Sequence, residues 1–410
     1  MEFTIPDAAL GNVIMRRVRA RNLKRLSPHS FAYHPQRDIF DAIIDLKSYL
    51  IDTAKVYSVQ IDFKDFFDSI PTKYLISLLD RPDIMSSTEA ERSAIKAFMG
   101  HQFAQRTEYA LGNFERRRRG TPQGSSISLI MANMANHSLD VMLERLPGKF
   151  VRFADDVTAL TSNYEDSNEI EHAFYKHSSS TGIRINKEKS PGINILDANN
   201  QEIRTVSKID YLGYRFTKEG LRLSDKTVRR IKAKISKLVS VYLIQYIRDV
   251  SFNPTRVSTV VPTFDWDLLG LISELRNYLY GGLSEAEIGR MIRQGKKLRR
   301  MAGLMSFYCL LDDKETLVEL DGWLVATVRR ATRERSKIIS SHFTSAAGLL
   351  PSNAELILGT WMDPAAWEGD PKPEFGLPSF VRGWRAAKKY YLTFGLEDVE
   401  PPKYSYQYSM

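Results

Sequence analysis

Two adjacent aspartates, Asp155 and Asp156, interrupt the apolar and β-prone run FVRFADDVTAL. Neighbouring carboxylates repel each other, so a positively charged partner normally lies beside such a pair. A third aspartate, Asp62, ends an earlier alternating segment. Carboxylates from two rigid elements can hold a pair of divalent metal ions, which activate an attacking hydroxyl and stabilise a leaving pyrophosphate. For the adjacent pair alone, a polar turn is the simpler interpretation.

Alternating apolar and polar residues predict the strand that carries Asp62. In the segment VYSVQIDFKDFF, the side chains of Tyr57, Val59, Ile61 and Phe63 fall on one face, and that of Asp62 falls on the other. A strand with this pattern buries one side in a core and presents its carboxylate on the polar side.

The second acidic segment is predicted to form an antiparallel hairpin with the two aspartates at its tip. The turn residues Pro147 and Gly148 lead into its first strand. Periodicity predicts an amphipathic helix in RDIFDAIIDLKSYLIDTA, and a capping box from Thr88 to Glu91 starts another helix over residues 88–100. Further elements are expected as helices at Ser128–Glu144 and around Asp166–Ser179 with a stop at Gly182, a strand IRIN, and a hairpin around Asn199 and Asn200. The predicted order is β, α, β, β, α, β.

Beyond about residue 224 the sequence becomes mostly helical and strongly basic. In SDKTVRRIKAKISKLVSVY, apolar residues recur at helical spacing and basic residues occupy the remaining surface. The apolar stripe comprises Val228, Ile231, Ile235, Leu238 and Tyr242. A Pro- and Gly-rich loop over residues 363–379 is followed by a last predicted helix, FVRGWRAAKKYYLTFG.

The composition favours a globular protein with an anionic partner. The chain has 410 residues, 43% of them hydrophobic, with a formal net charge of +9. Because basic residues are interleaved with aromatic ones, a nucleic-acid backbone fits this charge better than a membrane surface. The single cysteine, Cys309, and the scattered histidines exclude a disulfide framework and a zinc site. With a polar N-terminus and no run of ~20 apolar residues, we expect no membrane span and a cytoplasmic location.

Five segments provide the most specific signal. They occur in a fixed order at compatible spacings: VQIDFKDFFDSI, GTPQGSSISLIMANMANHSLD, VRFADDVTAL, IRINKEKS and IDYLGYRF. One after another they resemble the palm motifs A to E of reverse transcriptases, in the form found in group II introns, retrons and stand-alone bacterial enzymes. The resemblance covers roughly residues 30–220 and extends weakly into a thumb-like region. It departs from many relatives at Leu129, where they have proline, and at Phe153, where tyrosine is commoner.

The resemblance implies an α+β, right-hand polymerase fold. An N-terminal basic segment and fingers would occupy residues 1–55, and the palm, with inserted fingers elements, residues 56–223. A helical basic thumb would follow over residues 224–345, and a C-terminal extension over residues 346–410. The implied activity is RNA-directed DNA polymerisation by a two-metal mechanism, with two Mg²⁺ ions as cofactors or Mn²⁺ in their place.

The same resemblance implies a metal site. Asp62, Asp155 and Asp156 match the catalytic metal-binding aspartates, and the backbone carbonyl of Phe63 would be a further ligand. Asp62 and Asp155 would bridge both ions, and Asp156 would have a lesser role.

Other positions match residues that bind the incoming nucleotide. Phe67 matches an aromatic steric gate, whose ring fills the space of a ribose 2′-OH; packing in the core beside Phe66 is the alternative. Lys189 matches a lysine of motif D, with Lys187 as a rival and a solvated loop lysine as the simpler interpretation. The implied nucleotide-binding residues are Phe67, Gln123, Gly124, Lys189 and Arg37.

Nucleic-acid contacts are implied at three places. Tyr211, Leu212 and Gly213 match the primer grip, although a simple hairpin also explains them. Basic side chains would contact phosphates without reading sequence, and a solvated basic face is the alternative for each. They are Arg116, Arg117, Arg118 and Arg119 before motif B, and Arg229, Arg230 and Lys234 in the thumb-like region.

Within polymerases, an RNA-dependent RNA polymerase is disfavoured, because such enzymes usually have an aspartate five residues past the first metal ligand, where this chain has Phe67. A group II intron maturase stays open, although the chain lacks a Cys/His-rich endonuclease module. The usual retron signatures NAxxH and VTG are not found. The chain is most similar to stand-alone anti-phage reverse transcriptases of the abortive-infection type, which would copy a structured noncoding RNA into cDNA from dNTPs.

Three further questions stay open from the sequence. The first is whether the chain is an RNA-binding protein without polymerase activity. The second is whether it forms a homo-oligomer. Priming from a protein tyrosine is a third, with Tyr404, Tyr406 and Tyr408 of the tail as candidates.

Overall fold

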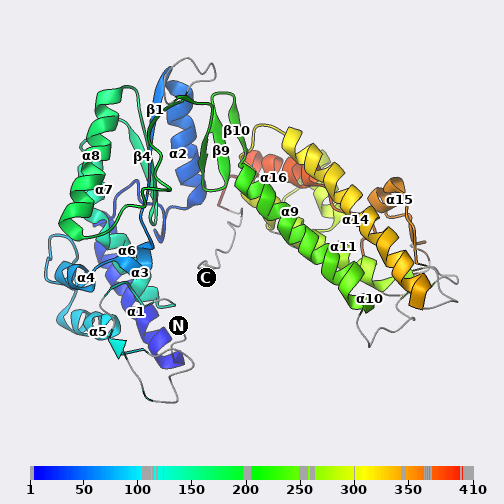
Figure 1. Cartoon of the computed structure of the whole chain (residues 1–410), viewed down its shortest axis with the longest axis horizontal. Coiled ribbons are helices and arrows are strands. Elements are labelled where there is room, and N and C mark those ends of the chain that lie inside the picture. The colour runs from blue at the N-terminus through cyan, green and yellow to red at the C-terminus, as the bar shows by residue number, and fades with distance from the viewer. Residues whose placement is uncertain are drawn as a thin grey trace. The chain divides into compact units, whose positions relative to one another are not determined.

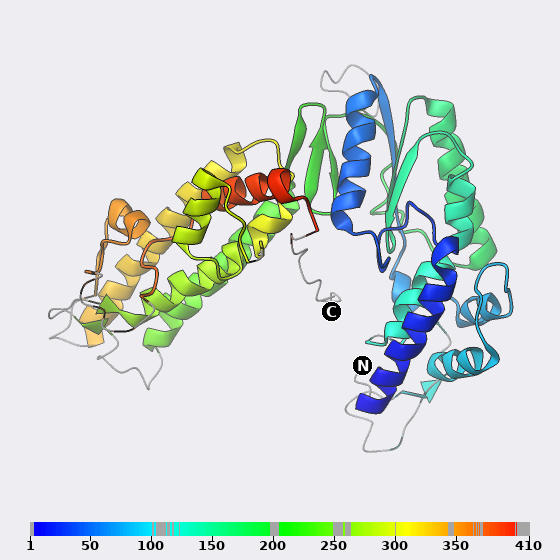
Figure 2. The same cartoon turned by 180° about the vertical axis from the view of Figure 1, so that it is seen from behind.

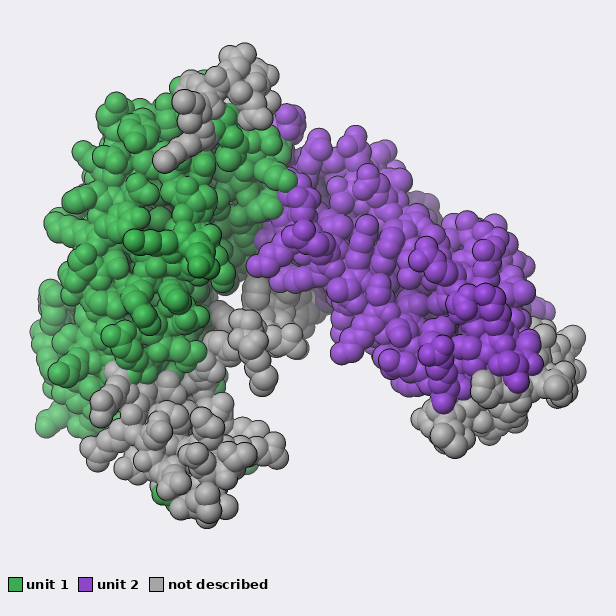
Figure 3. All heavy atoms as spheres, viewed as in Figure 1, with its two compact units in different colours: residues 1–212, 216–218 green, residues 213–215, 219–410 purple. Residues whose placement is uncertain are grey.

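The chain divides into two compact units, shown in Figure 3. Unit 1 comprises residues 1–212 and 216–218, and unit 2 comprises residues 213–215 and 219–410. The structure is a computed structural model that describes residues 4–100, 102–103, 112, 115–116, 119–122, 124–196, 205–248, 257–258, 264–299, 301–342, 348–363, 365, 367, 369, 372–397 and 399.

A five-stranded sheet forms the centre of unit 1. Its strand order is β4-β5-β1-β6-β7. The central strand β1 pairs antiparallel with β5 and β6, and β4 pairs antiparallel with β5 across the predicted hairpin. The strands are β1 (Val56–Asp62), β4 (Lys149–Phe153), β5 (Asp156–Thr161), β6 (Gly192–Leu196) and β7 (Thr205–Val206). With the helices described below, this sheet confirms the α+β class.

Two helices cover the sheet. Figure 1 and Figure 2 show the strands between α8 (Tyr164–Thr181) and α2 (Ile39–Asp52). Helix α8 contacts β1, β5 and β6, whereas α2 contacts β4 and β5. The predicted stop of α8 is confirmed, because Gly182 follows it in the left-handed conformation with φ +75°. Both faces of β1 are therefore largely buried, and within this strand only Gln60 and Asp62 are partly exposed.

The remaining elements of unit 1 are helices and two short strands. The capping box of Thr88 and Glu91 begins α5 as predicted. These elements are α1 (Ile5–Asn22), η1 (Leu23–Arg25), α3 (Phe66–Ser69), α4 (Thr72–Leu79), α5 (Glu89–Met99), β2 (Gln102–Phe103), β3 (Glu115–Arg116), α6 (Ser126–Ala135) and α7 (His137–Leu143).

The prediction of one helix over Ser128–Glu144 is wrong. The chain forms α6 and α7, separated at Asn136, whose φ of −96° and ψ of 4° are not helical. The Asn136 side chain is fully buried, and its Oδ1 lies 3.1 Å from Nε2 of His177 in α8. Asparagine is a weak helix former because its amide competes for hydrogen bonds, and here a tertiary partner decides the break.

Two predictions near the sheet edge are also wrong. The segment IRIN forms no strand, and only Ile185 makes an isolated antiparallel bridge, to Phe63. The strands on either side of Asn199 and Asn200 do not form the predicted antiparallel pair either, because β6 and β7 pair in parallel. One edge of β6 is already paired, antiparallel, with β1. Strand β7 therefore pairs with the other edge of β6. Residues 197–204, which join β6 to β7, lie outside the described part.

Unit 2 is mostly helical, as predicted for the chain beyond residue 224. Helix α9 buries Ile231 and Ile235 of the predicted stripe, while Val228 and Leu238 are only partly buried. Cys309 is buried. The elements are α9 (Asp225–Val239), the π-helix η3 (Ser240–Gln245), α10 (Tyr246–Arg248), β11 (Val257–Ser258), β12 (Phe264–Asp265), α11 (Trp266–Tyr280), α12 (Glu285–Gln294), α13 (Leu304–Phe307), α14 (Glu315–His342), α15 (Asn353–Leu358) and α16 (Phe380–Phe394).

A second sheet, of order β10-β9-β8, follows the five-stranded sheet in sequence. Its strands are β8 (Ile209–Tyr211), β9 (Tyr214–Thr217) and β10 (Gly220–Leu223), and the boundary between the units falls within it. None of the helices that the structure describes is both long and apolar enough to cross a membrane.

Candidate active site

The structure brings the three predicted acidic residues to one edge of the central sheet. In the register of β1 and β5, Asp62 lies directly opposite Asp156. Asp155 lies in the two-residue turn between β4 and β5, next to Ala154, whose φ is +61°. Cross-strand partners project to the same face of a sheet, so the Asp62 and Asp156 side chains start from neighbouring points. Residues almost a hundred positions apart thus form one acidic edge.

The electrostatics of this edge are unfavourable without a cation. Burial and, to a smaller extent, the negative charge of Asp62 raise the pKa of the Asp155 carboxyl to about 6, against the opposing effect of Lys189 and Arg152. A half-buried carboxyl close to a second one resists ionisation. A divalent cation would relieve both the burial and the repulsion.

Asp62 is held by the loop of the segment IRINKEKS, which the sequence matched to motif D. The Asp62 backbone N–H donates to Ser190 Oγ at 3.1 Å, and the Asn186 N–H donates to the Asp62 carbonyl at 2.8 Å. Asn186 Nδ2 also donates to Asp62 Oδ2 at 3.2 Å. Predicted residue Lys189 lies in the same loop, with its Nζ 3.9 Å from Asp62 Oδ2 and its side chain 74% exposed.

The predicted primer-grip residues differ in exposure. Tyr211 is buried, and its hydroxyl donates to the carbonyls of Asp156, at 3.1 Å, and Val151, at 3.4 Å. Leu212 and Gly213 form a tight turn with φ of +49° and +86°, and both are partly exposed. The backbone of this turn can meet another molecule, whereas the Tyr211 ring is committed to the core.

The two aromatic candidates for the steric gate, Phe66 and Phe67, differ in their ring contacts and in their exposure. The Phe66 ring packs against Phe63 at 5.7 Å between centroids and is 2% exposed. The Phe67 ring is 7% exposed and makes an edge contact with Tyr33 at 6.4 Å. The Phe67 carbonyl accepts from the N–H of Thr121, just before Gly124. The Phe67 ring also packs against the Phe66 ring, at 5.7 Å between centroids, within the core, and its role as a steric gate stays a prediction.

The motif B loop is shaped by local hydrogen bonds. Gly124 is exposed with φ +88°, a conformation that favours glycine. Ser125 Oγ accepts from the N–H of Ile127 at the start of α6, and Ser128 Oγ donates to the Pro122 carbonyl. Gln123 lies outside the described residues, so its predicted role stays a prediction.

The predicted cations fall into three groups. Arg37 donates to the Pro28 carbonyl and lies 5.7 Å from the Phe31 ring, so it already has local partners. Arg119 is exposed, whereas Arg117, Arg118 and the side chain of Arg116 lie outside the described part. In unit 2, the exposed cations of α9 include Arg229, Arg230 and Lys234. The proposed role of the Phe63 carbonyl stays a prediction.

The donors at the acidic edge fit Mg²⁺. The described residues include no group of three or more His, Cys, Asp and Glu side chains that would by itself hold a metal ion. Mg²⁺ is usually bound through one or two carboxylates together with substrate phosphates and water, so a complete protein cage is not required. The repelling, half-buried carboxylates of Asp62 and Asp155 supply the oxygen donors that such an ion prefers.

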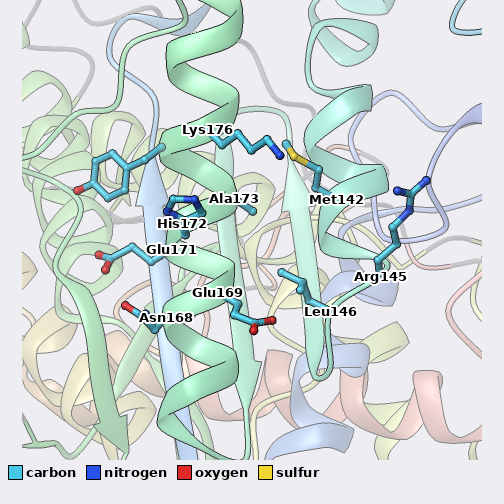
Figure 4. A pocket seen from close by; sticks show the side chains of 10 residues that line it. Met142, Arg145, Leu146, Asn168, Glu169, Glu171, His172, Ala173 and Lys176 are labelled. Carbon is cyan, nitrogen blue, oxygen red and sulfur yellow. The ribbon is translucent and has the colours of Figure 1, made fainter.

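A separate hollow lies between α7 and α8, as Figure 4 shows. Its volume is about 570 Å³, and its lining includes Met142, Arg145, Glu169, His172 and Lys176. None of the predicted site residues lines it. The acidic edge, rather than this hollow, is the candidate active site.

The comparison with protein families decides the class. Residues 7–216 match the family described as reverse transcriptase (RNA-dependent DNA polymerase). This match covers just over half of the 410 residues and includes every motif from A to E. The chain belongs to the reverse transcriptase family. The right-hand polymerase fold expected from the motifs is confirmed for this domain.

Solved structures of telomerase are also similar to this reverse transcriptase. The telomerase of Candida albicans, in complex with a TWJ fragment of telomeric RNA, has a TM-score of 0.41 and 14% identity over 83% of this chain and 55% of its own. The apo telomerase of Candida tropicalis has a TM-score of 0.40 and 12% identity over 83% of this chain and 50% of its own. The chain thus spans about half the length of these proteins. No curated protein matches it.

Proposed function

We propose that the chain is an RNA-directed DNA polymerase that extends a primer with dNTPs. The observation that carries this proposal is the register of β1 and β5, which sets Asp62 opposite Asp156 and next to Asp155 in a reverse transcriptase domain. These carboxylates lie at the ends of rigid strands. A site that must hold phosphates in a fixed position needs such rigid support.

Asp62 and Asp155 would hold two Mg²⁺ ions, with Asp156 in a supporting role. When bound, the ions lower the pKa of the primer 3′-hydroxyl and stabilise charge on the leaving pyrophosphate. The chain's own contribution is orientation. Hydrogen bonds from Asn186 and to Ser190 fix the backbone and the carboxylate of Asp62. The exposed ammonium of Lys189, 3.9 Å from that carboxylate, can steady a triphosphate or donate a proton to pyrophosphate.

Selection of deoxynucleotides would fall to Phe67. Its ring is held by contacts with Tyr33 and Phe66, and the hydrogen bond from Thr121 holds its backbone carbonyl. A fixed ring cannot move away from a ribose 2′-OH, so it excludes ribonucleotides by volume. The backbone near Gly124, unobstructed by a side chain, leaves room for the incoming base and sugar.

The template would be a structured noncoding RNA, held as template and partner. The exposed cations Arg229, Arg230 and Lys234 on α9 and Arg119 before motif B are suited to phosphate contacts. The resemblance of the five motifs to stand-alone anti-phage enzymes supports a role in bacterial defence, in the cytoplasm, with assembly into homo-oligomers as a further element of the proposal.

The test is incorporation of dNTPs by the purified chain, on an RNA template with a DNA primer and on the RNA that co-purifies from cells. We expect Mg²⁺-dependent extension by the wild type and loss of at least about 10³-fold in the Asp155→Ala, Asp156→Ala double variant, with RNA binding retained. Phe67→Ala should increase ribonucleotide incorporation. RNA binding without extension by the wild type on either template would instead favour a maturase or an RNA-binding protein.

A further inference from the structure

Arg152 is a fully buried cation next to the turn formed by Ala154 and Asp155, called the catalytic turn below. It lies in β4, three residues before Asp155, and is 1% exposed. Its guanidinium donates to both carboxylate oxygens of Asp140 in α7, through Nε at 2.7 Å and Nη2 at 2.5 Å. The same Nη2 donates to Asn133 Oδ1 in α6 at 2.8 Å. An arginine buried this deeply needs such partners, because an unpaired charge in a core is strongly destabilising.

One donor of Arg152 is directed at the turn itself. Its Nη1 donates to the carbonyl of Ala154 at 3.0 Å. Ala154 has φ +61°, a conformation that is uncommon for a residue with a side chain. The peptide whose carbonyl is held joins Ala154 to Asp155, so this hydrogen bond fixes the plane from which the Asp155 side chain departs.

Tyr211 holds the other end of the same turn. Its hydroxyl donates to the Asp156 carbonyl at 3.1 Å, and its ring is 2% exposed. Burial raises the pKa of this phenol well above its usual value, so the hydroxyl keeps its proton and stays a donor. The carbonyl just before Asp155 and the carbonyl of the residue just after it, Asp156, are therefore both held by buried donors from outside the turn.

The Arg152 cluster also connects the turn to two distant segments. The backbone of Arg152 exchanges hydrogen bonds with residues 29–31, because its N–H donates to the His29 carbonyl and its carbonyl accepts from Phe31. Asn133 Oδ1 accepts from Ser30 Oγ at 2.8 Å. The motif B helix α6, the N-terminal segment and the catalytic turn thus share one buried network.

We propose that Arg152 and Tyr211 are positioning residues, which hold the Ala154–Asp155 and Asp156–Val157 peptides so that the Asp155 carboxylate meets the metal ions in one orientation. The proposal rests on the proposed polymerase function. Tyr211 then acts through the Asp156 carbonyl rather than through its ring. Arg152 acts through the Ala154 carbonyl and ties the geometry of the turn to motif B.

Two variants test this assignment. Tyr211→Phe removes one hydroxyl and keeps the ring, and Arg152→Lys keeps the charge but loses the planar fork. We expect kcat to fall about 5- to 10-fold in Tyr211→Phe, the loss of one hydrogen bond, and about 10²-fold in Arg152→Lys, because a small misplacement has an effect of that size. The KM for dNTP and the affinity for RNA should change less than twofold.

Two readouts do not depend on turnover. Electron paramagnetic resonance of Mn²⁺ binding to the protein without nucleic acid should show weaker affinity in both variants. Amide hydrogen exchange should rise in the peptide that contains residues 154–157. Arg335→Lys is the matched control, since Arg335 is buried to 2% in unit 2 among carboxylates. It should lower thermal stability without changing kcat, Mn²⁺ affinity or exchange at the turn.

The inference is overturned if Tyr211→Phe and Arg152→Lys keep wild-type kcat and Mn²⁺ affinity at a temperature where each is folded. It is also overturned if Arg335→Lys changes these quantities equally. A wild type that does not extend a primer while Asp155 still binds Mn²⁺ contradicts the proposed function, and the exchange and Mn²⁺ measurements then test the positioning role alone.

Discussion

Arg152 in unit 1 and Arg335 in unit 2 are each buried in a polar cluster, and these two clusters differ in what they hold. In unit 2, Arg335 donates to Asp265 through Nε at 2.8 Å and to Asp267 through Nη2 at 2.7 Å. Asp265 also caps α11, accepting from the N–H groups of Asp267 and Leu268. In unit 1, Arg152 has one carboxylate partner, Asp140, and directs other donors at an amide and at backbone carbonyls.

This difference separates two uses of the same chemistry. The Arg335 cluster joins the start of α11 to the π-helix η3, through a long hydrogen bond to the Leu243 carbonyl at 3.4 Å, so every partner belongs to the helical framework. The Arg152 cluster ends on the Ala154 carbonyl, beside a candidate metal ligand. Disturbing the first should change stability alone, whereas disturbing the second should change stability and catalysis together.

The largest expected effect comes from removing a carboxylate partner. Asp140→Ala leaves the Arg152 charge buried with only neutral partners, and we expect it to lower the free energy of unfolding by about 3–5 kcal/mol. Asp265→Ala should have a smaller effect, because Asp267 still pairs with Arg335, although the α11 cap is also lost. Urea unfolding followed by circular dichroism measures both. A loss that is larger in Asp265→Ala would contradict the comparison.

An acid-sensitive group sharpens the contrast, because unit 1 buries His177 behind the sheet. Its ring nitrogens lie within hydrogen-bond distance of Asn136 and Ser138, and burial, together with the smaller effect of the Arg152 charge, lowers its pKa to about 3. The unfolded chain binds a proton below about pH 6.5 whereas the folded chain does not, so stability falls as the pH decreases from 6.5 towards 3. At pH 5 the histidine should lower the free energy of unfolding by about 2 kcal/mol.

His177→Gln keeps a buried polar side chain and removes the titration. The difference in stability between pH 7 and pH 5 should therefore be about 2 kcal/mol smaller in this variant than in the wild type. Equilibrium unfolding in urea at the two pH values measures it, with Arg335→Lys as a variant that should retain the wild-type pH dependence. An unchanged pH dependence in His177→Gln would show that the ring is not the acid-labile group.

The sequence predicted the parts of this site that lie in regular elements, and missed those that depend on tertiary contacts. Alternation predicted β1, the FADD run predicted the hairpin, and together they place Asp62 and Asp155 at strand ends. The break at Asn136 was missed, because the competing partner is His177, 41 residues away. Arg152 was not singled out either. Within VRFADD it reads as an exposed strand residue, and only the fold shows its burial against Asp140.

A smaller effect is expected at the loop that holds Asp62. Ser190 Oγ accepts from the Asp62 N–H at 3.1 Å, and Ser190→Ala removes this one acceptor. We expect a loss of about 1 kcal/mol in the free energy of unfolding and a lower Mn²⁺ affinity. Ser236→Ala on the exposed face of α9 is the control, and it should change neither quantity. If Ser190→Ala has wild-type metal affinity, the loop supports only the fold.

The smallest change in stability should come from replacing a whole ion pair with apolar residues of similar size. Buried pairs replaced in this way are often as stable as the original, because neither charge has to be desolvated. The double variant Arg152→Met, Asp140→Leu should therefore unfold within about 1 kcal/mol of the wild type. It nevertheless lacks the donor to the Ala154 carbonyl, so primer extension and Mn²⁺ affinity should fall as in Arg152→Lys. If the double variant keeps its stability and loses primer extension, Arg152 positions the turn in addition to stabilising the fold. Full activity in this variant would show that the buried arginine contributes to the core alone.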